Sequence, residues 1–98
     1  MMGVVDVNCF VDDDRGYELW RIRNRRGWVL NANREPSEAY LVLHAAECST
    51  ISGRPANGDA WTRDYAKICC SDRLVLESWA REKVGVSPQR CTHCMTPA

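Results

Sequence analysis

The most constraining feature of this sequence is a pair of cysteines near its end, Cys91 and Cys94, with two residues between them. This spacing is typical of one half of a tetrahedral metal site, and structural zinc is held by four such thiolate or imidazole ligands. Two thiolates fill only half of the tetrahedron, so the other ligands must come from elsewhere in the chain. The spacing therefore predicts a fold in which the last residues turn back and attach to the body of the protein.

Three upstream residues are candidates to complete this site: His44, Cys48 and Cys69. His44 and Cys48 are four residues apart, so they share one face of either a strand or a helix. Cys69 and Cys70 end an expected strand, and alternation places Cys70 in the core and Cys69 at the rim. We therefore predict a structural Zn²⁺ site formed by Cys48, Cys69, Cys91 and Cys94, with His44 as the alternative ligand.

The six cysteines leave a second possibility, which is a secreted module held together by disulfide bonds. Against it, Cys69 and Cys70 are adjacent, and a disulfide between neighbours is strained. The N-terminal residues also lack the basic region and the long apolar region of a secretory signal peptide. We therefore expect a cytoplasmic protein with reduced thiols.

Composition indicates a single small folded domain over residues 1–98, with no contact to a membrane. Hydrophobic residues make up 45% of the chain and include four tryptophans, which argues against disorder. No apolar run approaches the roughly 20 residues that cross a bilayer. The formal net charge is zero, so overall charge does not point to nucleic acid or to a membrane surface.

The hydrophobic pattern predicts an α+β fold with a small, mainly antiparallel sheet of four or five strands. Apolar residues recur at helical spacing from Leu74 to Val84, after a capping residue at Ser71 and before Gly85, which predicts one C-terminal helix over 72–84. The zinc-bound Cys-x2-Cys turn would fasten the end of the chain to this sheet. The other expected elements are strands at 4–11, 39–48 and 65–70, a β-hairpin at 17–31 and a loop at 49–64.

Arginines are concentrated in the expected hairpin at 17–31, and two tryptophans lie beside them. A two-stranded basic ribbon fits a DNA groove, and aromatic side chains can stack on unpaired bases. The ordinary alternative is that charges protect an edge strand while the tryptophans belong to the core. On this basis we predict a nucleic-acid-binding module, with DNA as the expected partner. The predicted contact residues are Trp20, Arg21, Arg23, Arg25, Arg26 and Trp28.

A protein-interaction or adaptor domain, such as a modulator in a phage–host system, is the alternative function. The acidic turn at 12–14 would lie beside the basic hairpin, and a surface with both signs of charge suits docking to another protein. An enzyme is not expected. The sequence has no phosphate-binding glycine loop and no paired carboxylates, and it offers no third group to orient a Cys48–His44 pair.

One longer pattern resembles a known class of domain. It runs from Leu43-His44 to Cys48, then through Lys67-Ile68-Cys69 and a helix with Trp79-Ala80, to the Cys-x2-Cys pair at 91–94. This order is similar to that of a small Cys/His zinc-binding domain of actinobacterial and phage proteins, sometimes associated with restriction-type endonucleases. The resemblance covers about half of the chain. It implies a zinc site and a nucleic-acid or defence context. Nuclease activity is not expected, because a His-Asn-His site needs two metal-binding histidines and neither His44 nor His93 has that setting.

Overall fold

The structure is a computed structural model, and it describes residues 6–53 and 60–95. These residues form an α+β fold of five strands, two α-helices and a short 3-10 helix. The elements are β1 Asn8–Phe10, α1 Asp14–Arg23, β2 Trp28–Ser37, β3 Tyr40–Ala45, η1 Ser49–Ile51, β4 Tyr65–Cys70, α2 Arg73–Lys83 and β5 Gln89–Arg90.

The strands form one five-stranded sheet in the order β1-β4-β2-β3-β5. The pairs β1–β4, β4–β2 and β2–β3 are antiparallel, whereas β5 runs parallel to β3. In the middle of the sheet, Leu30 lies between Leu43 and Ile68. The predicted small and mainly antiparallel sheet is therefore confirmed.

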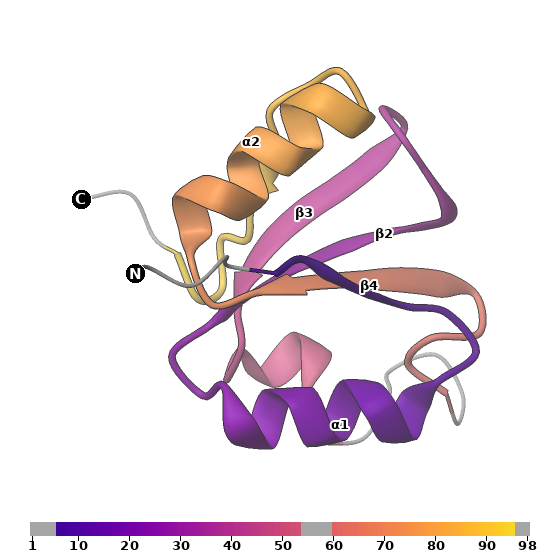
Figure 1. Cartoon of the computed structure of the whole chain (residues 1–98), viewed down its shortest axis with the longest axis vertical. Coiled ribbons are helices and arrows are strands. Elements are labelled where there is room, and N and C mark those ends of the chain that lie inside the picture. Colours follow the sequence, from indigo (N-terminus) through magenta and orange to yellow (C-terminus); the bar gives the residue numbers. More distant parts are fainter. Residues whose placement is uncertain (1–5, 54–59, 96–98) are drawn as a thin grey trace.

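The two α-helices lie on opposite faces of this sheet (Figure 1). On one face, Leu76 and Ala80 of α2 pack against a cluster that includes Leu30. On the other face, Tyr17 of α1 packs in a second cluster with Val29. Because both faces of the central strands are covered, β4 is buried from its second residue to its last. Burial on both faces explains why this strand is apolar at nearly every position.

Helix α2 occupies the range expected for the C-terminal helix, but its N-cap is Asp72 and not Ser71 as expected. The carboxylate of Asp72 accepts hydrogen bonds from the backbone N–H groups of Leu74 and Val75, at 2.9 and 3.3 Å, and so caps the first turn. At the other end, the N–H of Gly85 donates to the carbonyl of Ala80 at 3.0 Å. Gly85 has a φ of 99°, a conformation that favours glycine after a helix.

The predicted hairpin at 17–31 is wrong in its first half, because α1 covers Asp14–Arg23. Asp13 caps this helix by accepting a hydrogen bond from the N–H of Gly16 at 2.9 Å. Tyr17 is the one fully buried residue of the helix, whereas Leu19 and Ile22 are 41% and 60% exposed. With so few buried positions, the apolar residues of this segment follow neither the helical nor the strand spacing clearly. The cap at Asp13 and the packing of Tyr17 therefore decide its conformation.

Hydrogen bonds connect the expected acidic turn at 12–14 to the end of the expected loop at 49–64. The carboxylate of Asp14 accepts hydrogen bonds from the N–H groups of Trp61 and Thr62, at 2.7 and 2.8 Å. The N–H of Asp12 donates to the carbonyl of Thr62 at 2.7 Å, and its carboxylate pairs with Arg34. These contacts fix the start of α1 against the segment that leads into β4. Part of the expected loop, 54–59, and the start of the expected first strand lie outside the described residues.

Candidate metal centre

The C-terminal segment returns to the sheet through β5. Gln89 and Arg90 pair with Val42 and Leu43 of β3. The next residue, Cys91, donates its N–H to the carbonyl of Leu43 at 2.9 Å. These backbone contacts place the turn formed by residues 91–94 beside the end of β3, where His44 is located.

Four ligand groups meet at this point: His44, Cys48, Cys91 and Cys94. Their ligand atoms all lie within 4.8 Å of one another. The Sγ atoms of Cys48 and Cys91 are 3.9 Å apart. Two thiolates on one tetrahedral zinc ion, each bound at about 2.3 Å, are separated by roughly 3.8 Å. The group therefore has the composition and the spacing of a site that could hold a metal ion.

The structure brings together three of the four predicted ligands and adds His44, the residue named as the alternative. It does not place Cys69 in this group. The expectation that Cys69 lies at the rim of the sheet is wrong, because β4 is paired on both sides and Cys69 is fully buried beneath α1. Burial raises the pKa of this thiol above its usual value, so Cys69 behaves as a small apolar core residue.

His44 is suited to metal binding by its charge state and by its unused nitrogen. Burial, helped by the nearby Lys67 charge, lowers the pKa of His44 to about 4. The ring is therefore neutral at physiological pH, which is the form that binds metals. Nε2 is buried and has no hydrogen-bond partner among the described residues. A buried polar atom without a partner is costly, and a bound cation at this position would remove that cost.

Backbone N–H groups point at two of the three sulfurs. The N–H of His93 donates to the Sγ of Cys91, and the N–H of Ala45 donates to the Sγ of Cys94, both at 3.3 Å. Burial raises the pKa of Cys91, but the backbone N–H groups of Cys94 and His93 outweigh it, so the pKa lies below its usual value. For Cys94, burial and the neighbouring Cys48 raise the pKa to about 11. Three thiolates this close repel one another, and a shared cation offsets that repulsion.

Two hydroxyl groups surround the site. The Oγ1 of Thr50 lies 3.1 Å from the Sγ of Cys48 and 3.4 Å from the Nδ1 of His44. Ser49 forms a hydrogen bond of 2.9 Å with the Nε2 of His93, which lies outside the ligand group. The two Thr50 contacts are of the kind that orients ligand side chains in metal sites.

The residues predicted to contact nucleic acid gather at the C-terminal end of α1, but they no longer form one surface. Arg23, Arg25 and Arg26 are exposed. Arg21 is partly buried, donates from Nη1 to the carbonyl of Ala46 at 3.4 Å and lies over the ring of Tyr17. The two tryptophans pack against opposite cores, Trp20 on the α1 side of the sheet and Trp28 on the α2 side.

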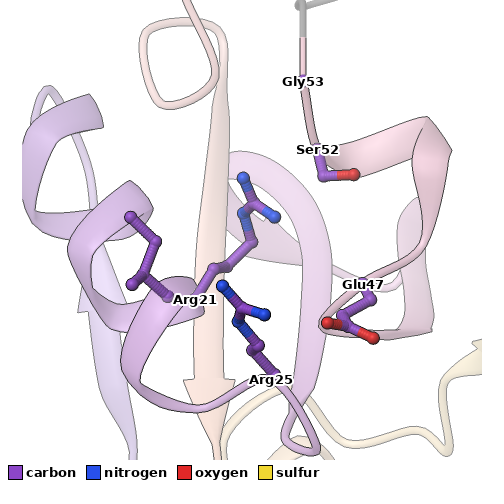
Figure 2. Close-up of a pocket in the computed structure, with 6 residues that line it drawn as sticks. Arg21, Arg25, Glu47, Ser52 and Gly53 are labelled. Atoms are coloured by element: carbon purple, nitrogen blue, oxygen red, sulfur yellow. The ribbon is translucent and has the colours of Figure 1, made fainter.

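Two hollows flank this basic end of α1. The first, of about 500 Å³, lies between Arg21 and Arg25 on one side and Glu47, Ser52 and Gly53 on the other (Figure 2). The second, of about 410 Å³, is lined by Arg23, Arg25 and Arg26 among other residues. Both hollows are lined by Ile22 and Arg25, so they lie next to each other. Sequence reasoning missed the contribution of 47–53, because that segment reaches α1 only through the tertiary fold.

Neither α-helix in 6–53 and 60–95 is long and apolar enough to cross a bilayer. Comparisons with protein-family models, with curated proteins and with solved structures each gave no match.

Proposed function

We propose that this chain is a small zinc-stabilised domain in which one Zn²⁺ has a structural role. The observation that carries this proposal is the convergence of one histidine and three cysteines, whose ligand atoms lie within 4.8 Å of one another. Three thiolates and one imidazole form a set that zinc prefers over hard cations. Four protein ligands fill the tetrahedron and leave no position for a substrate, which suits a structural ion. The ligands are His44, Cys48, Cys91 and Cys94.

The surrounding hydrogen bonds support this assignment of roles. If Nδ1 of His44 carries the ring proton, it donates to Thr50, and the Thr50 hydroxyl in turn donates to the sulfur of Cys48. That arrangement leaves the lone pair of Nε2 for the metal, and it is the nitrogen that has no partner in the described chain. A proton on the far nitrogen of a ligating histidine commonly fixes the ring in this way.

The test is elemental analysis of the purified protein, combined with thiol counting under denaturing conditions. We expect one zinc per chain and six reactive thiols once the metal is removed. Replacement of zinc by Co²⁺ should give the visible absorption of a tetrahedral thiolate site. A protein without metal and with few free thiols would overturn the proposal in favour of a disulfide module.

A second function, nucleic-acid binding, is favoured by the arginines at the end of α1. Arg23, Arg25 and Arg26 are exposed and make no ion pair with any other described residue. The two hollows beside them both use Arg25, so they offer an extended anion-binding path rather than a single point. The basic ribbon that would enter a DNA groove is absent from this region, because α1 replaces it. The path therefore suits a single strand, whose phosphates can follow a basic groove.

The alternative of a protein-docking surface has less support. It depends on a free acidic turn at 12–14, and each carboxylate of that turn already has a partner. Asp12 pairs with Arg34, Asp13 caps α1, and Asp14 accepts from Trp61 and Thr62.

Nucleic-acid binding and protein docking are distinguished by fluorescence anisotropy with labelled single-stranded and double-stranded oligonucleotides at several salt concentrations. Nucleic-acid binding should weaken steeply with salt, because each neutralised phosphate releases counterions. Failure to bind any oligonucleotide at low salt would remove this second function, without affecting the zinc proposal.

A further inference from the structure

The hollow between α1 and the segment 47–53 has hydrogen-bond donors on one wall and acceptors on the other. Figure 2 shows the guanidinium groups of Arg21 and Arg25 on the α1 side, with the Glu47 carboxylate and the Ser52 hydroxyl across from them. No ion pair joins these arginines to Glu47 in the structure. The charges on the two walls are therefore not neutralised by an ion pair across the hollow.

The donor wall is suited to a phosphate. Arg21 is held in place by the carbonyl of Ala46 and the ring of Tyr17, so its position is set before a ligand arrives. Arg25 is exposed and lines the same hollow as Arg21. Guanidinium groups bind phosphate oxygens through paired N–H donors, and two of them give both affinity and orientation.

The acceptor wall selects a different chemical group. The hydroxyl of Ser52 donates its proton to the carbonyl of Cys48 at 2.9 Å, so toward the hollow its oxygen can only accept. The Glu47 carboxylate is exposed and also only accepts. A ligand that fills the hollow must therefore place a hydrogen-bond donor within a short distance of its anionic group. A bare polyanion would be repelled by Glu47.

We infer that this hollow binds one ribose-phosphate unit of single-stranded RNA. The phosphate lies against Arg21 and Arg25, and the 2′-hydroxyl of the adjoining ribose donates to Glu47. DNA has no hydroxyl at this position, so the same carboxylate disfavours it. The volume of about 500 Å³ is in the range of small-ligand sites. The second hollow receives the next phosphate beside Arg23 and Arg26. The inference rests on the proposed nucleic-acid binding and adds the kind of nucleic acid.

The experiment compares three labelled strands of the same sequence and of roughly ten nucleotides. They are RNA, DNA, and RNA in which every 2′-hydroxyl is methylated. Binding is measured by anisotropy at fixed salt, with the zinc-loaded protein. We expect RNA to bind about tenfold more tightly than DNA, the effect of one hydrogen bond to a charged acceptor. The methylated strand should bind like DNA, because it keeps an RNA-like sugar but lacks the donor.

The matched variants are Glu47→Ala in the hollow and Glu82→Ala on the exposed side of α2. Both remove one exposed carboxylate, and Glu82 lines neither hollow beside α1. Glu47→Ala should weaken RNA binding and strengthen DNA binding, so that the two affinities converge. Glu82→Ala should keep the full difference between the RNA and DNA affinities. Zinc content and melting temperature show whether Glu47→Ala, next to the ligand Cys48, leaves the fold intact. If Glu47→Ala disrupts the fold, the comparison of RNA with its methylated form on the wild-type protein tests whether the 2′-hydroxyl is recognised.

Equal affinity for RNA and DNA, or equal affinity for RNA and its methylated form, overturns this inference but leaves nucleic-acid binding in place. Binding of no strand at all overturns both. Tighter binding of RNA that Glu47→Ala does not change, in a folded variant, assigns the preference to another part of the surface and overturns the role of this hollow.

Discussion

The sulfur atoms of Cys48 and Cys91 lie 3.9 Å apart, although the two residues are separated by 43 positions in the sequence. Cys48 follows β3 by three residues, and Cys91 directly follows β5. A metal ion bound by both would connect the end of the chain to the sheet at a point where only two residues of β5 pair with β3. The stability of the C-terminal segment should therefore depend on this connection.

Replacement of a ligand should show this dependence directly. We expect Cys91→Ser to lose zinc and to lower the free energy of unfolding by about 3 kcal/mol or more, because structural zinc contributes folding energy. The measurement is thermal and urea unfolding followed by circular dichroism. Cys9→Ser is the matched control, because Cys9 is an exposed thiol outside the ligand group. Normal melting of Cys91→Ser and of Cys94→Ser would show that no structural metal is present.

The choice between His44 and Cys69 as the fourth ligand can be tested with two alanine variants. His44→Ala should reduce zinc affinity strongly, because it removes one of four ligands. Cys69→Ala should keep one zinc per chain and lose about 1 kcal/mol of stability, the cost of a small cavity in the core. A competition assay with a chromophoric chelator measures both affinities. The reverse result would exchange the roles of the two residues.

The exposed arginines at the end of α1 should contribute to nucleic-acid binding but little to stability. The double variant Arg23→Ala/Arg25→Ala should weaken nucleic-acid binding about tenfold or more and reduce the salt dependence, because two phosphate contacts are lost. Its melting temperature should change little, since both side chains are exposed. Arg81→Ala/Lys83→Ala, at the end of α2, removes the same charge elsewhere and should leave binding unchanged. Equal losses in the two double variants would indicate an effect of net charge alone.

Lys67 should make stability depend on pH in the alkaline range. Its ammonium group is buried and donates to the Oδ1 of Asn31 and the carbonyl of Trp61, at 2.7 and 2.8 Å. Burial lowers the pKa of Lys67 from 10.5 to about 8, with Cys69 and Asp14 opposing the shift. Between these two values the unfolded chain holds a proton that the folded chain has released, so this group adds stability as pH rises from about 8 to 10.5.

The comparison that isolates this effect is urea unfolding of the wild type and of Lys67→Met at several pH values. Contributions from other groups, such as the cysteines, cancel in the difference. The stability of the wild type relative to the variant should increase across the interval and remain constant below it. A difference that does not change with pH would show that Lys67 keeps its proton in the folded state.

The sheet and α2 could be predicted from the sequence because their patterns are strong. Residues 65–70 are apolar except for Lys67, and α2 has a cap, an apolar side and a terminal glycine. Helix α1 has only one buried residue, Tyr17, and its start lies in the aspartate run 12–14, which is equally typical of a turn. Its cap at Asp13 was present in the sequence, but nothing local distinguishes a capping aspartate from one in a loop.

The error at α1 led to the error at Cys69. Without a helix on that face of the sheet, alternation placed Cys69 at an exposed rim, whereas α1 buries it completely. His44 and Cys48 could be recognised as candidates by their spacing alone. Their meeting with residues 91–94 depends on the parallel pairing of β5 with β3, a contact between distant segments that no local pattern encodes.

The parallel pairing of β5 also has a consequence for the behaviour of the protein at high concentration. β5 covers part of one outer edge of the sheet, because it pairs with Val42 and Leu43 on the side of β3 that faces away from β2. If chelation released the C-terminal segment, those backbone groups would be open to strands of neighbouring molecules. Metal loss would then promote self-association as well as lower stability. A bound ion would therefore also reduce aggregation.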